Sequence, residues 1–241
     1  MQNQQKSLPY FKSIDSKPMV FLNFIFGLFW VFFVLVFLGG MFFILTSSSK
    51  ETGFDEIVTI AFFFIMLFGI VSIVVVVMYS RKKIFTTTII DEKGIRYINK
   101  FNGLIVKDLP WSSFTKRERL AHVFESPKCD VVASTPMKSL FDQFYWPILV
   151  DNKVEIHSDA FTGKHYFMMF YSNRTELIKT FLLGLAHYRP DITIDPLIFD
   201  SHYIHSENYI IDYRQKKRIN ILSGLFCVFI LGLLYYFVIY K

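Results

Sequence analysis

The stretch "IVTIAFFFIMLFGIVSIVVVVMYSRKK", residues 57–83, is a long apolar run that ends in three consecutive cations. Only Thr59 and Ser72 interrupt the run before residue 79. A helix of residues 57–78 would rise about 33 Å, and the hydrocarbon core of a bilayer is about 30 Å thick. A buried helix of a soluble protein would keep a polar face, which this run lacks. We therefore expect a transmembrane helix at residues 57–78.

Two other runs have the same character. Residues 19–45 contain Asn23 as their one strongly polar residue, and residues 219–240 carry Asn220 and Ser223 near their start. The first run is much longer than the apolar part of a cleaved signal peptide, which has about 7–15 residues. The hydrophobic fraction of 53% and the mean hydropathy of +0.38 also exceed the values typical of soluble chains. The sequence therefore predicts three transmembrane helices.

The charges that flank these runs predict their orientation. Short segments on the cytoplasmic side of a membrane carry an excess of Lys and Arg. The N-terminal segment has three lysines against one acid, whereas residues 46–56 have one lysine against three acids. The other basic flanks are Arg81, Lys82 and Lys83, and Arg214, Lys216, Lys217 and Arg218. We expect a multi-pass protein of the plasma (inner) membrane, with the N-terminus and residues 81–218 in the cytoplasm and the C-terminus outside.

The basic isoelectric point, about 9.1, arises at the membrane edge. Residues 84–213, between the two basic flanks, hold 14 Lys and Arg against 16 Asp and Glu. A nucleic-acid-binding groove needs clustered cations on the domain itself, so nucleic acid is excluded as an expected partner. Each cation near an anionic leaflet gains about 1 kcal/mol. The seven flanking cations, Arg81, Lys82, Lys83, Arg214, Lys216, Lys217 and Arg218, are therefore the predicted contacts with membrane lipids.

The first part of the cytoplasmic segment predicts a three-stranded antiparallel meander. Residues 84–90, 95–101 and 104–111 are rich in β-branched and aromatic side chains. Asn102 and Gly103 favour a type I′ hairpin turn, because both residues tolerate a positive φ. Pro110 predicts that the third strand ends there or lies at a sheet edge. Such an edge could accept an added strand from a partner.

Further strands and one helix follow along the chain. Residues 121–126, 129–134, 146–158 and 164–172 are expected to be strands, with a polar turn at 159–163 and a solvated basic turn at 115–119. Residues 173–190 predict a helix with one apolar stripe, which begins at Asn173 in a capping box with Glu176. Such a helix would cover an open barrel or sandwich.

An aromatic cluster lies between the predicted strands, at Phe141, Phe144, Tyr145 and Trp146. Amphipathic aromatic rings favour the interface between membrane and water, so the cluster is a candidate interface. The same residues would also serve as a hydrophobic core. Both interpretations stay open at this point.

The order of these features resembles the bacterial membrane-anchored pleckstrin-homology-like (YcxB-like) proteins, over about residues 20–190. The resemblance rests on "TIIDEKGIRY" at 88–97, on Pro110, Trp111 and Ser112, and on "YSNRTELIKTFL" at 171–182. It implies a small antiparallel β-barrel, like that of pleckstrin-homology (PH) domains, closed by a C-terminal helix, and it carries no catalytic residues. The longer segment 115–147 and the third apolar run depart from the family pattern.

The expected fold class is therefore a membrane α-helical protein with a cytoplasmic α+β domain. The predicted segments are a cytoplasmic N-terminal segment at 1–18, transmembrane helices at 19–45, 57–78 and 219–240, an outside loop at 46–56, a PH-like domain at 81–190 and a juxtamembrane linker at 191–218.

The sequence offers little catalytic chemistry. Asp200, His202, His205 and Glu207 could share a metal, but no second ligand cluster accompanies them, so we expect surface or packing histidines and no metal or cofactor. Phosphate loops, nucleophile elbows and paired cysteine motifs are missing from the sequence, and we expect no enzymatic activity. The apolar runs contain no charged residue that could relay protons. Their glycines suit close helix packing, either among the protein's own helices or against a partner.

The most economical function is a non-catalytic binding or scaffold protein that presents its cytoplasmic domain to a protein partner. One alternative is an immunity protein that neutralises a toxin in or at the bilayer. Another is an accessory subunit of a transport or secretion complex. The sequence leaves homo- and hetero-oligomers equally open.

Overall fold

The computed structural model describes residues 8–47, 51, 53–83, 85–117, 128–137, 139–165 and 168–239. The predicted strand 121–126 lies outside these residues. The chain forms two compact units. The first, called the α1–α3 unit, contains Ser13–Pro110 and Phe161–Leu177. The second, called the α6 unit, contains Met1–Lys12, Trp111–Ala160 and Ile178–Lys241.

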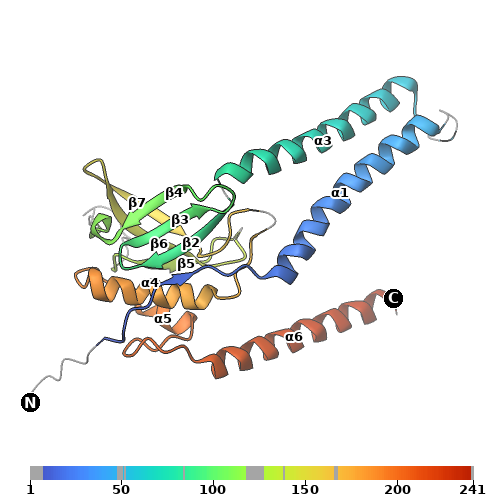
Figure 1. Ribbon diagram of the computed structural model, residues 1–241. Coiled ribbons are helices and arrows are strands. Elements are labelled where there is room, and N and C mark those ends of the chain that lie inside the picture. The colour runs from blue at the N-terminus through green and yellow to red at the C-terminus, as the bar shows by residue number, and fades with distance from the viewer. Residues whose placement is uncertain are drawn as a thin grey trace, which may run out of the picture. The chain divides into compact units, whose positions relative to one another are not determined.

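Three long helices account for the apolar runs: α1 (Val20–Thr46), α3 (Glu56–Lys83) and α6 (Tyr213–Ile239) (Figure 1). Each is long and apolar enough to cross a membrane, and none of their apolar windows is buried inside the protein. Both α3 and α6 extend beyond the predicted spans 57–78 and 219–240. The basic flanks are therefore helical themselves, in the last turn of α3 and the first turns of α6.

Helices α1 and α3 pack against each other through small residues. A Cβ atom on Gly40 of α1 would lie 2.7 Å from the Met66 sulfur of α3. A Cβ on Gly69 of α3 would lie 2.9 Å from the Phe37 ring of α1. These two glycines allow the helices to approach closely, as small residues do in membranes. The glycines could pack either among the protein's own helices or against a partner. For Gly40 and Gly69, packing among the protein's own helices is confirmed.

The α1–α3 unit contains a four-stranded antiparallel sheet in the order β1 (Ile14–Asp15), β2 (Thr86–Asp91), β3 (Gly94–Asn99) and β4 (Ile105–Pro110). The predicted three-stranded meander is confirmed as β2–β3–β4. Strand β1 was not predicted, and it pairs Ile14 with Ile90 of β2. Its two residues are too short to give a pattern in the sequence.

The turn between β3 and β4 differs from the prediction. A type I′ turn needs two positive φ angles, but of Asn102 and Gly103 only the glycine has one, at 67°. The Gly103 N–H donates to the Asn99 carbonyl at 2.9 Å, which closes a wider turn. Consecutive positive φ angles occur instead at Asp151 (49°) and Asn152 (61°).

The α6 unit contains a separate antiparallel sheet of β5 (Val132–Ser134), β6 (Gln143–Val150) and β7 (Lys153–Asp159). The predicted single strand 146–158 is thus a hairpin, and Asp151 and Asn152 form its turn. The expected closed barrel is wrong for the described residues, since their strands form two sheets with no hydrogen-bonded ladder joining them. The predicted strand 164–172 is also wrong: its described residues contain only an isolated bridge from Tyr171 to Pro18.

Helix α4 (Arg174–Tyr188) confirms the predicted helix. Its apolar stripe is fully buried at Leu177, Ile178, Phe181, Leu182 and Leu185. The Phe181 ring lies 4.8 Å from the ring of Trp146 and 6.3 Å from that of Phe114. The neighbouring one-turn helix η1 (Trp111–Ser113) adds Trp111, which stacks at 5.7 Å on Tyr188. Aromatic packing therefore forms the core of the α6 unit.

Candidate functional site

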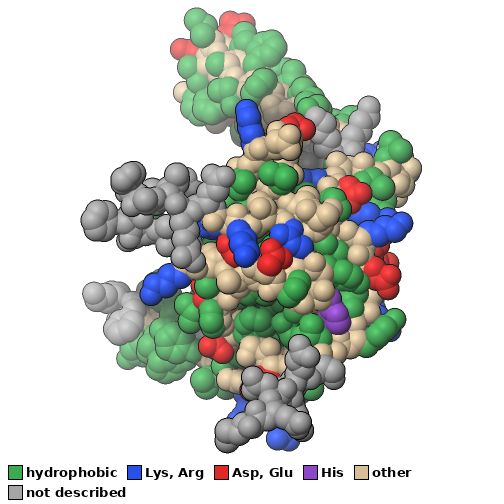
Figure 2. Space-filling model, turned by 90° about the vertical axis from the view of Figure 1, so that its left-hand side faces the viewer, with side chains coloured by type: hydrophobic (Ala, Val, Ile, Leu, Met, Phe, Trp, Pro, Cys, Tyr) green, Lys and Arg blue, Asp and Glu red, His purple; other side chains and the backbone are tan. Residues whose placement is uncertain are grey.

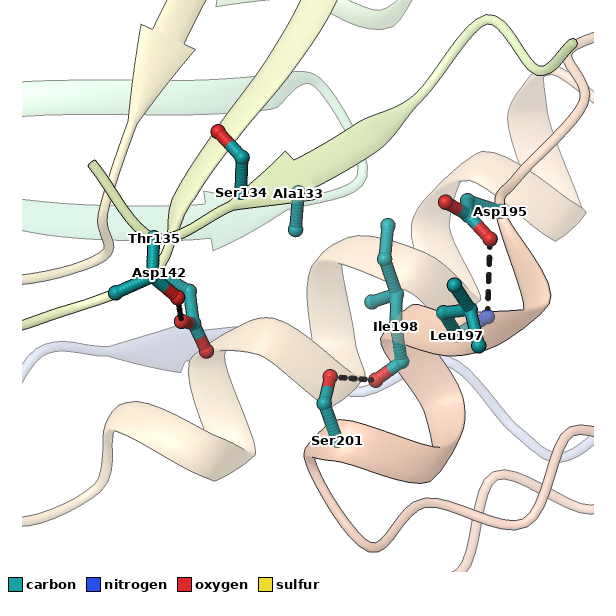
Figure 3. A pocket seen from close by; sticks show the side chains of 8 residues that line it. All are labelled: Ala133, Ser134, Thr135, Asp142, Asp195, Leu197, Ile198 and Ser201. Atoms are coloured by element: carbon teal, nitrogen blue, oxygen red, sulfur yellow. Dashed lines mark hydrogen bonds between the residues drawn. The ribbon is translucent and has the colours of Figure 1, made fainter. Parts of the chain in front are cut away.

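A hollow of about 160 Å³ lies between β5 and a short helix, α5 (Pro196–Ser201), in the α6 unit (Figure 3). We call it the β5–α5 hollow. Its lining combines carboxylates, hydroxyls and apolar side chains. The lining residues are Ala133, Ser134, Thr135, Asp142, Asp195, Leu197, Ile198 and Ser201.

The segment before α5 is held next to β5 by Asp130, which is buried just before β5. Its carboxylate accepts hydrogen bonds from the backbone N–H of Arg117 at 2.8 Å, and from the N–H and the hydroxyl of Thr193, each at 2.8 Å. Burial raises the pKa of this carboxyl, but the hydrogen bonds from Thr193 and Arg117 outweigh it, so the net pKa is lowered. The ionised carboxylate thus holds the segment before α5 against β5.

Local sequence explains why α5 begins where it does. Asp195 is the N-cap, and its carboxylate accepts a hydrogen bond from the Leu197 N–H at 3.0 Å. Pro196 occupies the first turn, where a proline costs no hydrogen bond. An Asp-Pro pair before an apolar run is a helix-start signal. Sequence reasoning could have found α5 within the predicted linker 191–218 from this signal.

Two of the three hydroxyls that line the hollow, those of Thr135 and Ser201, are held by local hydrogen bonds. The Thr135 hydroxyl donates to the Asp142 carboxylate, and the Ser201 hydroxyl donates to the Ile198 carbonyl at 3.1 Å (Figure 3). The other oxygen of Asp142 lies 3.5 Å from Nε2 of the buried His202. Both hydroxyls thus donate to acceptors other than His202, whereas a catalytic nucleophile donates its hydrogen bond to its general base.

Large apolar side chains are exposed on α5 and on the loop between two of the lining residues, Thr135 and Asp142. Met137 and Leu140 lie on the loop that joins Thr135 to Asp142; Met137 is fully exposed and Leu140 is 73% exposed. Leu197, on α5, is 70% exposed. Exposed apolar groups beside polar anchors are typical of protein-binding surfaces, and methionine adapts to varied partners. The composition of the sequence gave no signal for these exposed side chains, since exposure depends on the fold.

The predicted aromatic interface separates into two pairs. Phe144 and Trp146 are fully buried, while Phe141 and Tyr145 are half-buried. The Trp146 ring packs on Phe181, so Trp146 belongs to the core. The core interpretation therefore holds for Phe144 and Trp146, which cannot reach a membrane surface without unfolding.

The four candidate metal ligands do not come together. His202 is buried and stacks on Phe144 with 5.3 Å between ring centroids, whereas Asp200, His205 and Glu207 are exposed. Within the residues that the structure describes, no group of three His, Cys, Asp or Glu side chains could hold a metal ion.

The predicted lipid-contacting cations lie at the ends of the helices. Arg81 is exposed in the last turn of α3, in which Lys82 and Lys83 also lie. Arg214, Lys217 and Arg218 are exposed and Lys216 is half-buried in the first turns of α6. Elsewhere, on the face drawn in Figure 2, Lys and Arg side chains lie among Asp and Glu side chains and do not gather into one basic surface.

Comparison with family models, with curated proteins and with solved structures found no match to this chain.

Proposed function

We propose that this protein is a non-catalytic, membrane-anchored binding protein that holds a protein partner at the cytoplasmic face of a bacterial inner membrane. The observation that carries the proposal is the β5–α5 hollow together with exposed apolar side chains: its lining residue Leu197, and Met137 and Leu140 on the loop between Thr135 and Asp142. The three apolar helices supply the anchor. The basic flanks of α3 and α6 support the cytoplasmic orientation, through the excess of cations on that side.

The chemistry of the hollow defines the partner that it fits. Fully burying one large apolar side chain is worth about 1.5–3 kcal/mol, so covering the exposed Met137, Leu140 and Leu197 favours association. Asp142 and Asp195 place carboxylates inside the hollow. The expected partner segment therefore carries a large apolar side chain next to a Lys or Arg. Such apolar contacts with a charged anchor are common in transient protein interfaces.

Membership in the PH-like (YcxB-like) family is part of the same proposal. The described order, antiparallel strands followed by the buried helix α4, is compatible with that resemblance. A fold does not fix a function, so the proposed function is argued from the β5–α5 hollow and not from this resemblance.

Site-directed photo-crosslinking tests the function. A photoreactive phenylalanine analogue is placed at Leu197 or at Met137 in the full chain, in native membranes. The control position is Ile156 on β7, which is exposed in the same unit but lies outside the hollow's lining. We expect a discrete adduct from Leu197 and Met137, and loss of the Met137 adduct when Leu197→Asp is added. The absence of adducts, or the same adducts from Ile156, would contradict the proposal.

The identity of the adduct separates the alternatives. A toxin as the adduct, with the chain needed for viability only when that toxin is present, would make the protein an immunity protein. Co-purification of a stable multi-subunit assembly in mild detergent would make it an accessory subunit of a transport or secretion complex.

A further inference from the structure

The turn between β3 and β4 is attached to the end of α3. The Asn99 side-chain amide donates to the Arg81 carbonyl at 3.1 Å, and the Lys100 N–H donates to the Phe85 carbonyl at 3.1 Å. The guanidinium of Arg81 lies 3.9 Å from the centroid of the Phe101 ring, within cation–π distance. All these residues belong to the α1–α3 unit. The turn is therefore fixed relative to α3.

This attachment sets the depth of the turn if α3 crosses the bilayer. The apolar run of α3 ends at Met78, and Arg81 follows within one helical turn, about 4.5 Å along the axis. The polar interfacial layer on each side of a bilayer is about 5–7 Å thick. The ring of Phe101, packed on Arg81, is thus placed at the level of the lipid headgroups.

The turn exposes side chains that are unusual for a hairpin in water. Phe101 is 51% exposed, Leu104 64% and Ile105 52%, and Val106 beside them is also exposed. We call residues 100–106 the β3–β4 tip. Phenylalanine and leucine are typical of proteins that bury side chains at the boundary between headgroups and acyl chains. Arg81 and Lys100 add cations, which match an anionic leaflet.

The opposite end of the same strand has different chemistry. The turn between β2 and β3 contains Glu92 and Lys93, which are exposed and charged. Strand β3 separates the two turns by about 17 Å, from its residue spacing of about 3.4 Å. One sheet thus carries an apolar turn beside α3 and a charged turn away from it.

We propose that the β3–β4 tip inserts into the interfacial layer of the phospholipid leaflet at the end of α3. The partner is the lipid surface, and the proposal depends on α3 crossing the membrane and not on the proposed protein partner. The inserted tip would give the α1–α3 unit a third point of membrane contact besides its two helices. It would also cover apolar surface that water would otherwise contact.

Spin-label accessibility tests the insertion. The full chain with Cys129→Ser and Cys227→Ser receives Leu104→Cys or the matched control Lys93→Cys, carries a nitroxide label, and is placed in nanodiscs of phosphatidylcholine and phosphatidylglycerol. Oxygen collects in lipid and a nickel chelate stays in water. We expect the ratio of oxygen to chelate collisions to be about tenfold higher at residue 104 than at residue 93.

A second variant distinguishes lipid contact from shielding by protein. Ile105→Asp puts a charge on the exposed tip, and the ratio at residue 104 should then fall to the value at residue 93. Equal ratios at residues 104 and 93 in the parent chain would overturn the proposal. Low collision rates with both oxygen and chelate at residue 104 would also overturn it, because they show burial in protein. This test is independent of the proposed function. If photo-crosslinking at the β5–α5 hollow gave no adduct, the collision ratios expected at residues 104 and 93 would stay the same.

Discussion

At the scale of single residues, Asn23 has the clearest structural role. It lies in the first turns of α1 and is buried. Its side chain donates to the Phe170 carbonyl at 2.9 Å and accepts from the Phe170 N–H at 2.9 Å. The two residues lie 147 positions apart, so the sequence could not show the contact. The sequence showed Asn23 only as the one strongly polar residue of its apolar run, whereas the structure shows that it ties α1 to the loop before α4.

Replacement of Asn23 by leucine should weaken this attachment. Asn23→Leu removes both hydrogen bonds and leaves the Phe170 N–H without the acceptor that Asn23 supplies, which costs about 1–3 kcal/mol in a buried position. The free energy of unfolding in detergent micelles, measured with a denaturant, checks this value. Thr59→Val is the matched control, because the Thr59 hydroxyl makes a local hydrogen bond, to the Asp55 carbonyl at 2.8 Å just before α3. Equal losses in both variants would contradict the assigned role.

His165 should make the stability of the α1–α3 unit depend on pH. Burial lowers the pKa of its imidazole below 6.5, and a hydrogen bond with the Val77 backbone opposes this in part. The folded state therefore favours the neutral ring. The stabilising effect is fully present above about pH 6.5 and is lost as the pH falls through the lowered, folded-state pKa.

The variant His165→Gln tests this pH dependence, because an amide can still donate to the Val77 carbonyl but does not titrate. We expect the unfolding free energy of the variant to fall less than that of the parent chain between about pH 7 and pH 5. Replacement of the exposed His205 by glutamine should leave the parent's pH dependence unchanged. The same slope in the parent and in His165→Gln would refute the assignment.

At the scale of elements, the two hairpin turns differ in backbone strain. Non-glycine residues at positive φ cost about 1–2 kcal/mol each. Asp151 and Asn152 both adopt such angles, and the register Val150 to Lys153 confirms a two-residue turn. Asp and Asn tolerate this conformation better than other residues do, but glycine tolerates it best.

Asn152→Gly should therefore stabilise the protein by up to about 1 kcal/mol, since it relieves the strain at φ 61°. Asn102→Gly is the control, because Asn102 does not have a positive φ, and glycine there should give no gain. Denaturant unfolding of both variants measures the difference. A higher free energy of unfolding in Asn102→Gly, with no increase in Asn152→Gly, would contradict our interpretation of the two turns.

Short-range sequence patterns predicted the elements that depend on residues close together in the chain. Helix α4 was visible from its stripe Leu177–Leu185, and β2, β3 and β4 were visible from their β-branched residues. The Asp151–Asn152 hairpin was missed because its flanking residues read as one continuous strand. Strand β1 and the two-sheet arrangement were missed because they depend on pairing between distant segments. The β5–α5 hollow could not be predicted for the same reason: β5 and α5 are separated by two strands and a helix.

At the scale of the whole molecule, the orientation of the chain can be measured directly. The basic flanks predict that residues 81–218 face the cytoplasm and that residues 46–56 face outward. An impermeant maleimide added to intact cells should label Ser47→Cys but should reach the native Cys129 only after the membrane is opened. Labelling of Cys129 in intact cells would invert the predicted orientation. The variant Cys129→Ser supplies the background for the Ser47→Cys measurement.

The short strand β1 constrains how the protein can be synthesised. Ser16, just after β1, accepts a hydrogen bond from the Thr88 N–H of β2, 72 positions further along, and both α1 and α3 lie between the two residues in the chain. The ribosome therefore releases β1 before either helix and releases its partner strand after both. The sheet therefore cannot be completed until both helices have left the ribosome, so the two helices can pack or insert before β1 finds its partner strand. Until β2 emerges, β1 stays an unpaired strand that cellular proteases can recognise.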